Sequence, residues 1–175
     1  VGNGEALGTG GLTVSGASTL DNTAAVTLNN NVALNAGLAI AGTQNLTLGG
    51  VVSGASQLIK NGAANLTLGS ANTLTGGVAL NGGTLTAGNN AALGSGSLTV
   101  GGASTLDNSA GVSLANNVGL NGALTVAGNN ALALTGVISG ASQLIKNGPT
   151  NLTLSGTNTY AGGTALNGGT LTLGT

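Results

Sequence analysis

The sequence predicts an all-β protein, a right-handed parallel β-solenoid, and three observations lead to this fold class. The segment 53–62 returns unchanged at 139–148, which defines an 86-residue repeat. Inside each copy, apolar residues recur with a 20-residue period. Locally, apolar residues alternate with Thr, Ser and Ala in short runs, and Gly and Asn separate the runs. Period-2 alternation predicts short strands with one buried face, and a fixed repeat of this length is typical of a solenoid.

The long repeat defines the domain organisation. We assign residues 1–11 to the end of a preceding repeat, 12–97 to the first repeat and 98–175 to a second, truncated repeat, all in one continuous solenoid domain. Three pairs of segments carry the repeat: 12–22 with 98–108, 53–62 with 139–148, and 65–86 with 151–172.

The 20-residue period predicts the length of a coil. Leu38, Leu58, Val78 and Leu98 follow this period and should form one inward column, and Val26, Leu46 and Leu66 should form another. From Leu12 to Leu38, however, the sequence shows a 26-residue step. We therefore expect 20-residue coils, with one 26-residue coil in each 86-residue repeat. The extra segment should bulge near 17–22 and again near 103–108, on the same side of the solenoid.

Three strands fit in each coil, and the expected strands of two coils are 26–28, 32–34, 38–40, 46–48, 51–53 and 57–59. Asn-Gly pairs begin at 61, 81, 121, 147 and 167 and predict corners, because Asn and Gly tolerate positive φ. Equivalent strands should stack about 4.8 Å apart, and the right hand follows from the general preference of parallel crossovers. An antiparallel sandwich is the competing all-β fold, but it gives no reason for an identical 20-residue step.

The composition excludes most kinds of chemistry. The chain has two Lys, three acidic residues and one Tyr, and it has no His, Cys, Met, Trp or Phe. Thiol and imidazole metal sites and a Ser–His–Asp arrangement cannot be built. With a net charge of −1, the chain has no basic patch for nucleic acid. It also has no run of about 18 apolar residues, so we expect no direct membrane insertion of this segment. We expect no cofactor and no enzymatic activity. Because neither an initiator Met nor a signal segment begins the chain, we also expect a piece of a longer polypeptide.

The expected bulges contain the candidate surface-loop contacts Asp21, Asn22, Asp107 and Asn108. A protruding loop with these groups would suit a cation or a glycan. The alternative is an Asx turn, in which the side chain bonds to the nearby backbone. One carboxylate per repeat is poor for Ca²⁺, which takes six to eight oxygen ligands. We predict no catalytic, cofactor-binding or metal-binding residue.

Lys60 and Lys146 are the only side-chain cations. Strict alternation from Leu58 points Lys60 inward, where an unpaired ammonium is costly. We therefore expect the strand to end at Ile59 or the amine to reach out at the corner.

Outward Thr residues suggest a further alternative. Thr27, Thr47 and Thr67 have outward parity at the 20-residue spacing, and such a ladder is typical of ice-binding solenoids. The matching positions of the second repeat are Ser113, Ala133 and Thr153, so we expect the ladder to decay.

Residues 58–85 read L-I-K-N-G-A-A-N-L-T-L-G-S-A-N-T-L-T-G-G-V-A-L-N-G-G-T-L, and 144–171 repeat the pattern with Tyr160 and a Gly-Gly-Thr. This segment resembles the passenger-associated transport repeat of bacterial autotransporters. Both copies depart from that pattern at one glycine, where Ala64 and Thr150 stand. The resemblance implies a secreted or cell-surface β-helical passenger of a Gram-negative bacterium, in which the motif is associated with transport and folding.

Three functions follow as hypotheses. The first is a non-catalytic structural shaft or spacer of an adhesin or an extracellular, biofilm-type filament, with identical or similar repeats stacked end to end as its partners. The second is a binding module that uses a lateral face for a glycan, a host surface or matrix. The third, an enzyme, is disfavoured because Asp21 and Asp107 should lie about 19 Å apart along the axis, whereas two-carboxylate hydrolysis needs about 5–10 Å.

Overall fold

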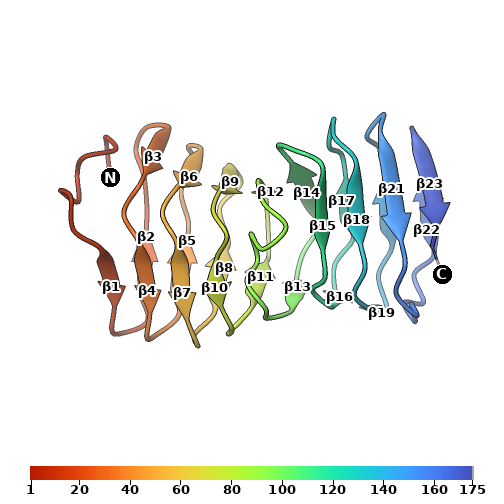
Figure 1. The fold of residues 1–175 in the computed structure, drawn as a ribbon, viewed down its shortest axis with the longest axis horizontal. Coiled ribbons are helices and arrows are strands. Elements are labelled where there is room, and N and C mark those ends of the chain that lie inside the picture. The colour runs from red at the N-terminus through yellow and green to blue at the C-terminus, as the bar shows by residue number, and fades with distance from the viewer. Residues whose placement is uncertain (175) are drawn as a thin grey trace.

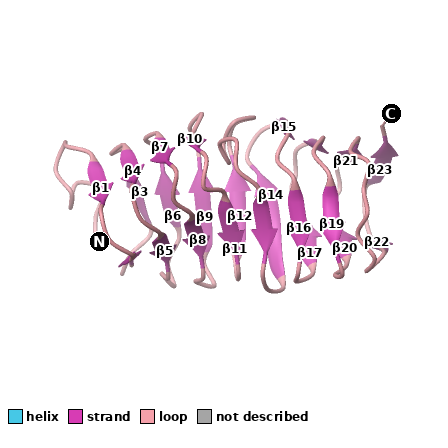
Figure 2. Ribbon diagram, turned by 90° about the horizontal axis from the view of Figure 1, so that it is seen from below, coloured by secondary structure: helices cyan, strands magenta, loops and turns pink. Residues whose placement is uncertain are grey.

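The computed structural model describes residues 1–174, which form a single row of stacked coils with the two ends of the chain at opposite ends of the row (Figure 1). The described residues contain 23 short strands and no helix. Every pairing between neighbouring strands is parallel, and the view in Figure 2 shows the same row of coils from a second side. The all-β parallel solenoid expected from the sequence is therefore confirmed.

The strands form four parallel sheets, here named A to D. Sheet A contains β1 (Leu12–Val14), β4 (Val32–Leu34), β7 (Val52–Gly54) and β10 (Thr73–Leu74). Sheet B contains β2 (Ser18–Leu20), β5 (Leu38–Ile40), β8 (Leu58–Lys60), β11 (Val78–Leu80), β13 (Leu98–Val100), β16 (Val118–Leu120) and β19 (Ile138–Gly140). Sheet C contains β3 (Val26–Leu28), β6 (Leu46–Leu48), β9 (Asn65–Leu68), β12 (Thr84–Ala87), β14 (Ser104–Asn108), β17 (Leu124–Val126), β20 (Leu144–Lys146) and β22 (Thr164–Leu166). Sheet D contains β15 (Val112–Leu114), β18 (Leu132–Leu134), β21 (Asn151–Leu154) and β23 (Thr170–Leu173).

The inward columns are those that the sequence predicts. Leu38 pairs with Leu58, Leu58 with Val78 and Val78 with Leu98, and all four side chains are buried. The second column is confirmed as well, since Val26, Leu46 and Leu66 pair in the same way in sheet C. Of the six strands expected, β7 and β8 begin one residue later than predicted. Burial of one Leu side chain contributes about 1.5–3 kcal/mol, so these columns hold the coils together without aromatic residues.

The predicted 26-residue coil is wrong. Leu12 pairs with Val32, which is the ordinary 20-residue step. The expected bulges are strands, because residues 18–20 form β2 and residues 104–108 form β14. The error has a physical reason: Leu12 and Leu38 lie in sheets A and B, so the interval between them separates two different sides of the solenoid.

Because the coil length is constant, the 86-residue repeat does not return to the side on which it began. Each repeat position moves one sheet further: β1 lies in sheet A, but its counterpart β13 lies in sheet B. Likewise β2 in sheet B corresponds to β14 in sheet C, and β3 in sheet C corresponds to β15 in sheet D. Along the chain, each strand of sheet A lies between a strand of sheet C and a strand of sheet B, and the strands of sheet D take the same place in later coils. Sheets A and D therefore lie on the same side of a three-sided solenoid. One repeat therefore advances four and one-third turns.

The interruption between sheets A and D is a compact turn at residues 89–96, which we name the plug turn. It takes the place of a strand between β12 and β13, and it buries Ala92 and Leu93 in the core. The amide N–H of Ala91 donates to Asn89 Oδ1 at 2.9 Å, an Asx turn that starts the segment. Residues 3–10 form the equivalent turn, and the assignment of residues 1–11 to the end of a preceding repeat stays a prediction.

Replacement of Leu98 by Ala tests the core column. Leu98 is fully buried between Val78 and Val118, so Leu98→Ala should lower the free energy of unfolding by about 2–5 kcal/mol. The neighbouring side chain of Thr99 lies on the other face of β13, and Thr99→Ala should change it by no more than about 0.5 kcal/mol. Urea unfolding of both variants measures this difference, and equal effects would contradict the inward assignment.

Candidate functional site

The buried side chain of Asn22 bonds to two neighbouring coils, an arrangement that we name the asparagine clip. This side chain is 2% exposed, and Nδ2 donates to the carbonyl oxygens of Ala24 at 2.8 Å, Gln44 at 3.0 Å and Asn45 at 3.1 Å. The carboxylate of Asp21 accepts the Asn22 amide N–H at 2.8 Å. The side chain thus satisfies carbonyl groups of its own corner and of the next coil, as buried polar groups require.

Asn108 repeats this arrangement. Its Nδ2 donates to Ala110 O at 2.6 Å and to Ala131 O at 3.0 Å, and Asp107 Oδ1 accepts its amide N–H at 2.6 Å. The side chain of Asn108 is buried too. The protruding loop expected at both places is therefore absent, and the two asparagines present no contact group to solvent. A ligand contact through the two aspartates stays a prediction.

Asp21 and Asp107 do not share a side of the molecule. Asp21 follows β2 of sheet B, whereas Asp107 lies within β14 of sheet C. The expectation that both lie on the same side is wrong because each repeat is turned by one side relative to the last. Nowhere in residues 1–174 do three His, Cys, Asp or Glu side chains lie close enough together to hold a metal ion.

The remaining amide oxygens, Asn22 Oδ1 and Asn108 Oδ1, are buried and have no hydrogen-bond partner. Each one points at a glycine of the next coil. A Cβ at Gly42 would lie 2.1 Å from Asn22 Oδ1, and a Cβ at Gly128 would lie 2.1 Å from Asn108 Oδ1. The glycine Cα–H bond is directed at the oxygen in both places, a weak contact of the Cα–H···O type. Only glycine permits this approach, so the pair of Asn and Gly residues belongs to the coil-to-coil packing.

Lys60 and Lys146 are fully buried, which the sequence-based expectation did not allow. Lys60 ends β8 and is 1% exposed, within the inward column between Ile40 and Leu80. Its Nζ donates to the carbonyl oxygens of Gly62 and Gly82, the latter at 3.2 Å. The strand therefore does not end at Ile59, and the amine does not reach solvent at the corner. Two peptide carbonyls satisfy the ammonium inside the solenoid.

The second copy has the same geometry. Lys146 is 1% exposed, and its Nζ donates to the carbonyl oxygens of Gly148 and Gly168, the latter at 3.3 Å. Neither lysine donates to a carboxylate in these bonds, and burial lowers the pKa of both ammonium groups. Each lysine thus fastens the Asn-Gly corner of its own coil to the Asn-Gly-Gly corner of the next one.

The Thr ladder lies on sheet C, but its hydroxyl groups are partly engaged in bonds within the protein. Thr27, Thr47 and Thr67 pair in order, and Thr67 pairs with Thr86. Asn65 then joins two of these rungs, because it donates to Thr67 Oγ1 at 3.2 Å and accepts from Thr86 Oγ1 at 2.9 Å. The predicted continuation is on a different side of the solenoid: Ser113, Ala133 and Thr153 pair in sheet D.

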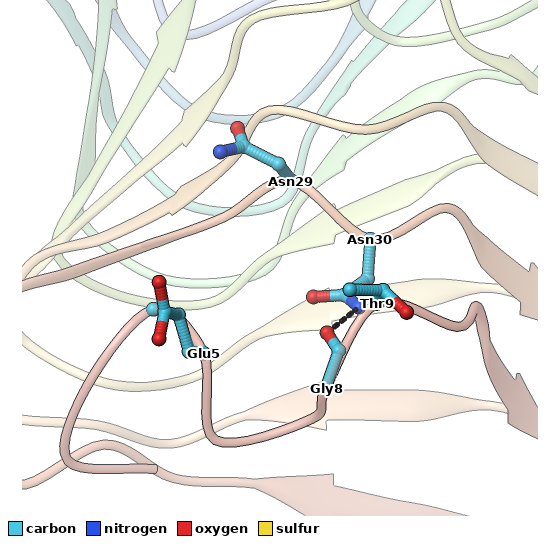
Figure 3. Close-up of a pocket in the computed structure, with 6 residues that line it drawn as sticks. Glu5, Gly8, Thr9, Asn29 and Asn30 are labelled. Atoms are coloured by element: carbon cyan, nitrogen blue, oxygen red, sulfur yellow. Dashed lines mark hydrogen bonds between the residues drawn. The ribbon is translucent and has the colours of Figure 1, made fainter.

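A hollow of about 560 Å³ lies beside residues 3–10, the turn equivalent to the plug turn (Figure 3). The Asn30 amide donates across it to the Gly8 carbonyl at 2.9 Å. A smaller hollow of about 340 Å³ occupies the equivalent place of the second repeat. All six lining positions correspond through the 86-residue repeat: Gly4, Glu5, Gly8, Thr9, Asn29 and Asn30 with Asn90, Ala91, Gly94, Ser95, Ala115 and Asn116. The hollow is thus a property of the repeat, but its carboxylate is not, since Ala91 replaces Glu5.

The stacked coils and the lysine-fastened corners define a parallel β-solenoid with a corner contact that recurs in both repeats. Residues 58–87 and 144–173 match the passenger-associated-transport-repeat family, so the chain carries two such repeats. The resemblance to an autotransporter passenger drawn from the sequence is thereby confirmed. No curated protein and no solved structure matches the chain. In the described part of the chain, no helix has the length and apolar character needed to cross a membrane.

The position of the lysines explains part of the family pattern. The lysine and the first glycine of the match are Lys60 and Gly62, and the later Gly-Gly pair of the Asn-Gly-Gly corner is Gly82 and Gly83. The Lys60 ammonium bonds to the carbonyls of Gly62 and Gly82. The matched residues therefore form one contact between two coils. Sequence reasoning missed this contact because it treated the lysine as a charge to be kept in water.

Truncation of Asn22 tests the clip. Asn22→Ala removes the buried Nδ2 donor that three carbonyls share, and only Asn45 O keeps another donor, the Val26 N–H, so we expect a loss of about 1–3 kcal/mol in the free energy of unfolding. Asn29 is exposed, and Asn29→Ala serves as the matched control with a change of about 0.5 kcal/mol or less. Denaturant unfolding gives both values. A clip that contributes nothing would leave the two variants equally stable.

The buried lysines predict a dependence of stability on pH. Because their pKa values are lowered in the folded protein, the unfolded chain binds more protons over the range between the lowered values and 10.5. The free energy of unfolding should therefore rise as the pH rises toward 10.5. Denaturant unfolding from neutral pH up to 10.5 measures this slope, and Lys60→Met with Lys146→Met should abolish most of it. An unchanged slope in the double variant would contradict the assignment of the effect to the two lysines.

Proposed function

We propose that this chain is a non-catalytic shaft or spacer segment of a secreted or cell-surface passenger, of the kind found in an adhesin or an extracellular filament. The single observation that carries the proposal is the one-third turn by which each 86-residue repeat is offset from the last. Equivalent residues of successive repeats lie on different sides of the solenoid, as β1 and β13 do in sheets A and B. A repeated lateral binding surface would need the opposite arrangement.

The chemistry of the sides supports the same proposal. The two hollows beside the plug turns are equivalent, yet Glu5 and Asn29 of the first are replaced by Ala91 and Ala115 in the second. The carboxylate and one amide of the first hollow are thus not repeated in the second, whereas the groups that join coils are. The clip of Asn22 and the clip of Asn108 are nearly identical, as are the two lysine contacts. Selection for stacking explains this difference better than selection for a ligand.

The two passenger-associated transport repeats support a location outside the cell or on its surface. Passengers of this kind are exported, and a fold without thiols depends on no redox environment. A shaft also needs rigidity. Neighbouring coils here are bonded through backbone ladders, and buried asparagines and the two buried lysines add bonds at particular corners. The proposal assigns the chain the task of holding other parts of its passenger at a distance.

A glycan-binding module is the second candidate, and the hollow at Glu5 is the observation that favours it. Glu5, Thr9 and Asn29, which carry a carboxylate, a hydroxyl and an amide, are among the residues that line the hollow beside residues 3–10 (Figure 3). Such groups bond to sugar hydroxyls. The shaft proposal expects no sugar bound there.

Two measurements separate these candidates. Residues 1–172 followed directly by 1–175 form a fusion that continues the 86-residue period, and small-angle X-ray scattering measures its length. With about 4.8 Å per coil, the fusion should be a straight rod about 80 Å long, twice the length of the single chain. A bent or compact fusion would contradict the shaft. On a glycan array the chain should give no signal, and a signal removed by Glu5→Ala but not by Asp21→Asn would establish the binding module instead.

A further inference from the structure

We propose that Asn121 is a site of spontaneous deamidation in the folded solenoid, and that the paired asparagines of the lysine-fastened corners are protected from this reaction. The inference goes beyond the proposed shaft function, because it concerns a covalent change of the chain with time. It rests on a comparison of corners that have the same Asn-Gly sequence but different side-chain contacts.

Six Asn-Gly pairs occur in the sequence, and five of them lie at corners, directly after a strand. The five corner asparagines are exposed, and they are Asn61, Asn81, Asn121, Asn147 and Asn167. The sixth pair begins at Asn3 in the turn of residues 3–10, where Asn3 Oδ1 accepts the Glu5 N–H at 3.0 Å. Water can therefore reach the side-chain amide at every corner.

Close packing of the coils requires glycine after these asparagines. A Cβ at Gly62 would lie 2.2 Å from Gly42 O, and a Cβ at Gly122 would lie 2.5 Å from the carbonyl carbon of Gly102. No larger residue fits at either place without a shift of the backbone. Glycine has no side chain to hinder an attack by its own amide nitrogen, so the packing of the corners creates the sequence that deamidates most readily.

Deamidation is an intramolecular substitution at the side-chain amide. The amide nitrogen of Gly122 gives up its proton to a base in the solvent and attacks Cγ of Asn121. A bond forms between this nitrogen and Cγ, the Cγ–Nδ2 bond breaks, and ammonia leaves after it takes a proton from water. Water then opens the resulting succinimide at either carbonyl group and gives aspartate or isoaspartate. The whole reaction consumes one water and releases one ammonia.

Four of the five corner asparagines are joined in pairs across neighbouring coils. Asn81 Nδ2 donates to Asn61 Oδ1 at 2.9 Å, and Asn167 Nδ2 donates to Asn147 Oδ1 at 2.8 Å. The amide must turn toward its own backbone before it can be attacked, and this movement breaks the bond. The need to break one such bond should slow the reaction at either partner by roughly two- to tenfold.

Asn121 has no partner of this kind. It stands in the same column of corners as the first pair, between sheets B and C, but the neighbouring coils present Gly101 on one side and Ala141 on the other. Neither residue has a side-chain amide, and within residues 1–174 the Asn121 side chain makes no hydrogen bond. Its amide is therefore free to turn toward its own backbone.

The attacking amide is held alike at four of the five corners, so the side chain makes the difference. The Gly122 N–H donates to Val100 O at 2.9 Å, and the Gly62 N–H donates to Ile40 O at 3.1 Å. The two corners of the second pair have the same bond to the preceding coil. Because this backbone bond must open before the attack at all four corners, its effect on the rate is common to them.

The protected corners are those that hold the buried lysines. The Lys60 ammonium bonds to the carbonyls of Gly62 and Gly82, each of which follows a paired asparagine. Isoaspartate carries the main chain through its side chain and adds one bond to the coil, which would move these carbonyls away from the ammonium. No lysine lies at the Asn121 corner, so the same change there lengthens a coil without uncovering a buried charge.

Site-resolved mass spectrometry tests the proposal. The folded chain is kept at mildly alkaline pH for increasing times, then unfolded and cut after Lys60 and Lys146, and tandem spectra locate each amide-to-acid change. Asn61 and Asn121 are the matched comparison, because Ala follows the Asn-Gly pair in both. Asn121 should convert at least about twofold faster than Asn61 in the folded chain, and the two should convert at similar rates in urea. A ratio of the two rates that is no larger in the folded chain than in urea would overturn the proposal, as would an Asn121 that stays unconverted in the folded chain.

Removal of one partner tests the protection of the pairs. Asn61→Ala takes away the oxygen that accepts from Asn81 Nδ2, and the Gly82 N–H makes no backbone bond in the part of the chain that the structure describes. Conversion at Asn81 should therefore rise by roughly two- to tenfold. Asn121→Ala is the matched control, since it removes an exposed asparagine from the same column and should leave the rate at Asn81 unchanged.

The other pair serves as a reference within the same molecule. In the Asn61→Ala protein, Asn147 keeps its partner and should convert at the rate of the unaltered chain. A parallel rise at Asn147 would assign the change to a loosened solenoid and contradict the protective role of the pair. Equal rates at Asn81 in Asn61→Ala and Asn121→Ala would contradict it as well.

Discussion

The constant length of the coil is the constraint on which the rest of the structure depends. A parallel ladder between neighbouring coils requires that equivalent residues meet, and the pairs Leu38 with Leu58 and Leu12 with Val32 both keep the 20-residue step. Where one coil is shorter, the next compensates: Asn65 pairs with Thr84, one position short of that step, and Thr84 pairs with Thr105, one position beyond it. A coil lengthened without such compensation would move every inward side chain out of its column and leave backbone groups unpaired. An 86-residue repeat must therefore be fitted to the coil, and it ends one-third of a turn away from its beginning.

Tight stacking of the coils shields backbone carbonyl groups at the corners from water, and these groups need hydrogen-bond donors from the protein. Buried amide and ammonium groups satisfy them, as Asn22 and Lys60 do. An inward position in a column is unfavourable for the charge of a lysine. At that position, however, the ammonium group can donate hydrogen bonds to carbonyls of two coils at once. This use of polar groups explains how a chain with only 3% charged residues contains so much buried hydrogen bonding. It also explains why the contacts between coils are kept in both repeats while the groups lining the hollows change.

Much of the fold could be predicted from the sequence, because the columns at Leu38 and Val26 follow directly from a 20-residue period and a period-2 pattern. The rotation of the repeat could not be obtained in the same way. All three sides carry the same Leu-Thr-Val type of strand, so the pattern does not reveal to which side Leu12 or Leu38 belongs. The burial of Lys60 was missed because its partners are backbone carbonyls, which have no signature in a sequence. The plug turn did leave a signal: Leu7-Gly8 and Leu93-Gly94 recur through the 86-residue repeat where a further alternating strand would be expected.

Disulfide formation within one chain is the most direct test of the 20-residue step at the start of each repeat. Thr13 pairs with Ala33 in the structure. A protein with Thr13→Cys and Ala33→Cys should form an intramolecular disulfide readily, because neighbouring outward residues of parallel strands lie within the reach of such a bond. A protein with Thr13→Cys and Ala39→Cys should not, since those residues lie in sheets A and B. Efficient closure of the second pair together with failure of the first would restore the 26-residue coil and remove the one-third-turn rotation between successive repeats.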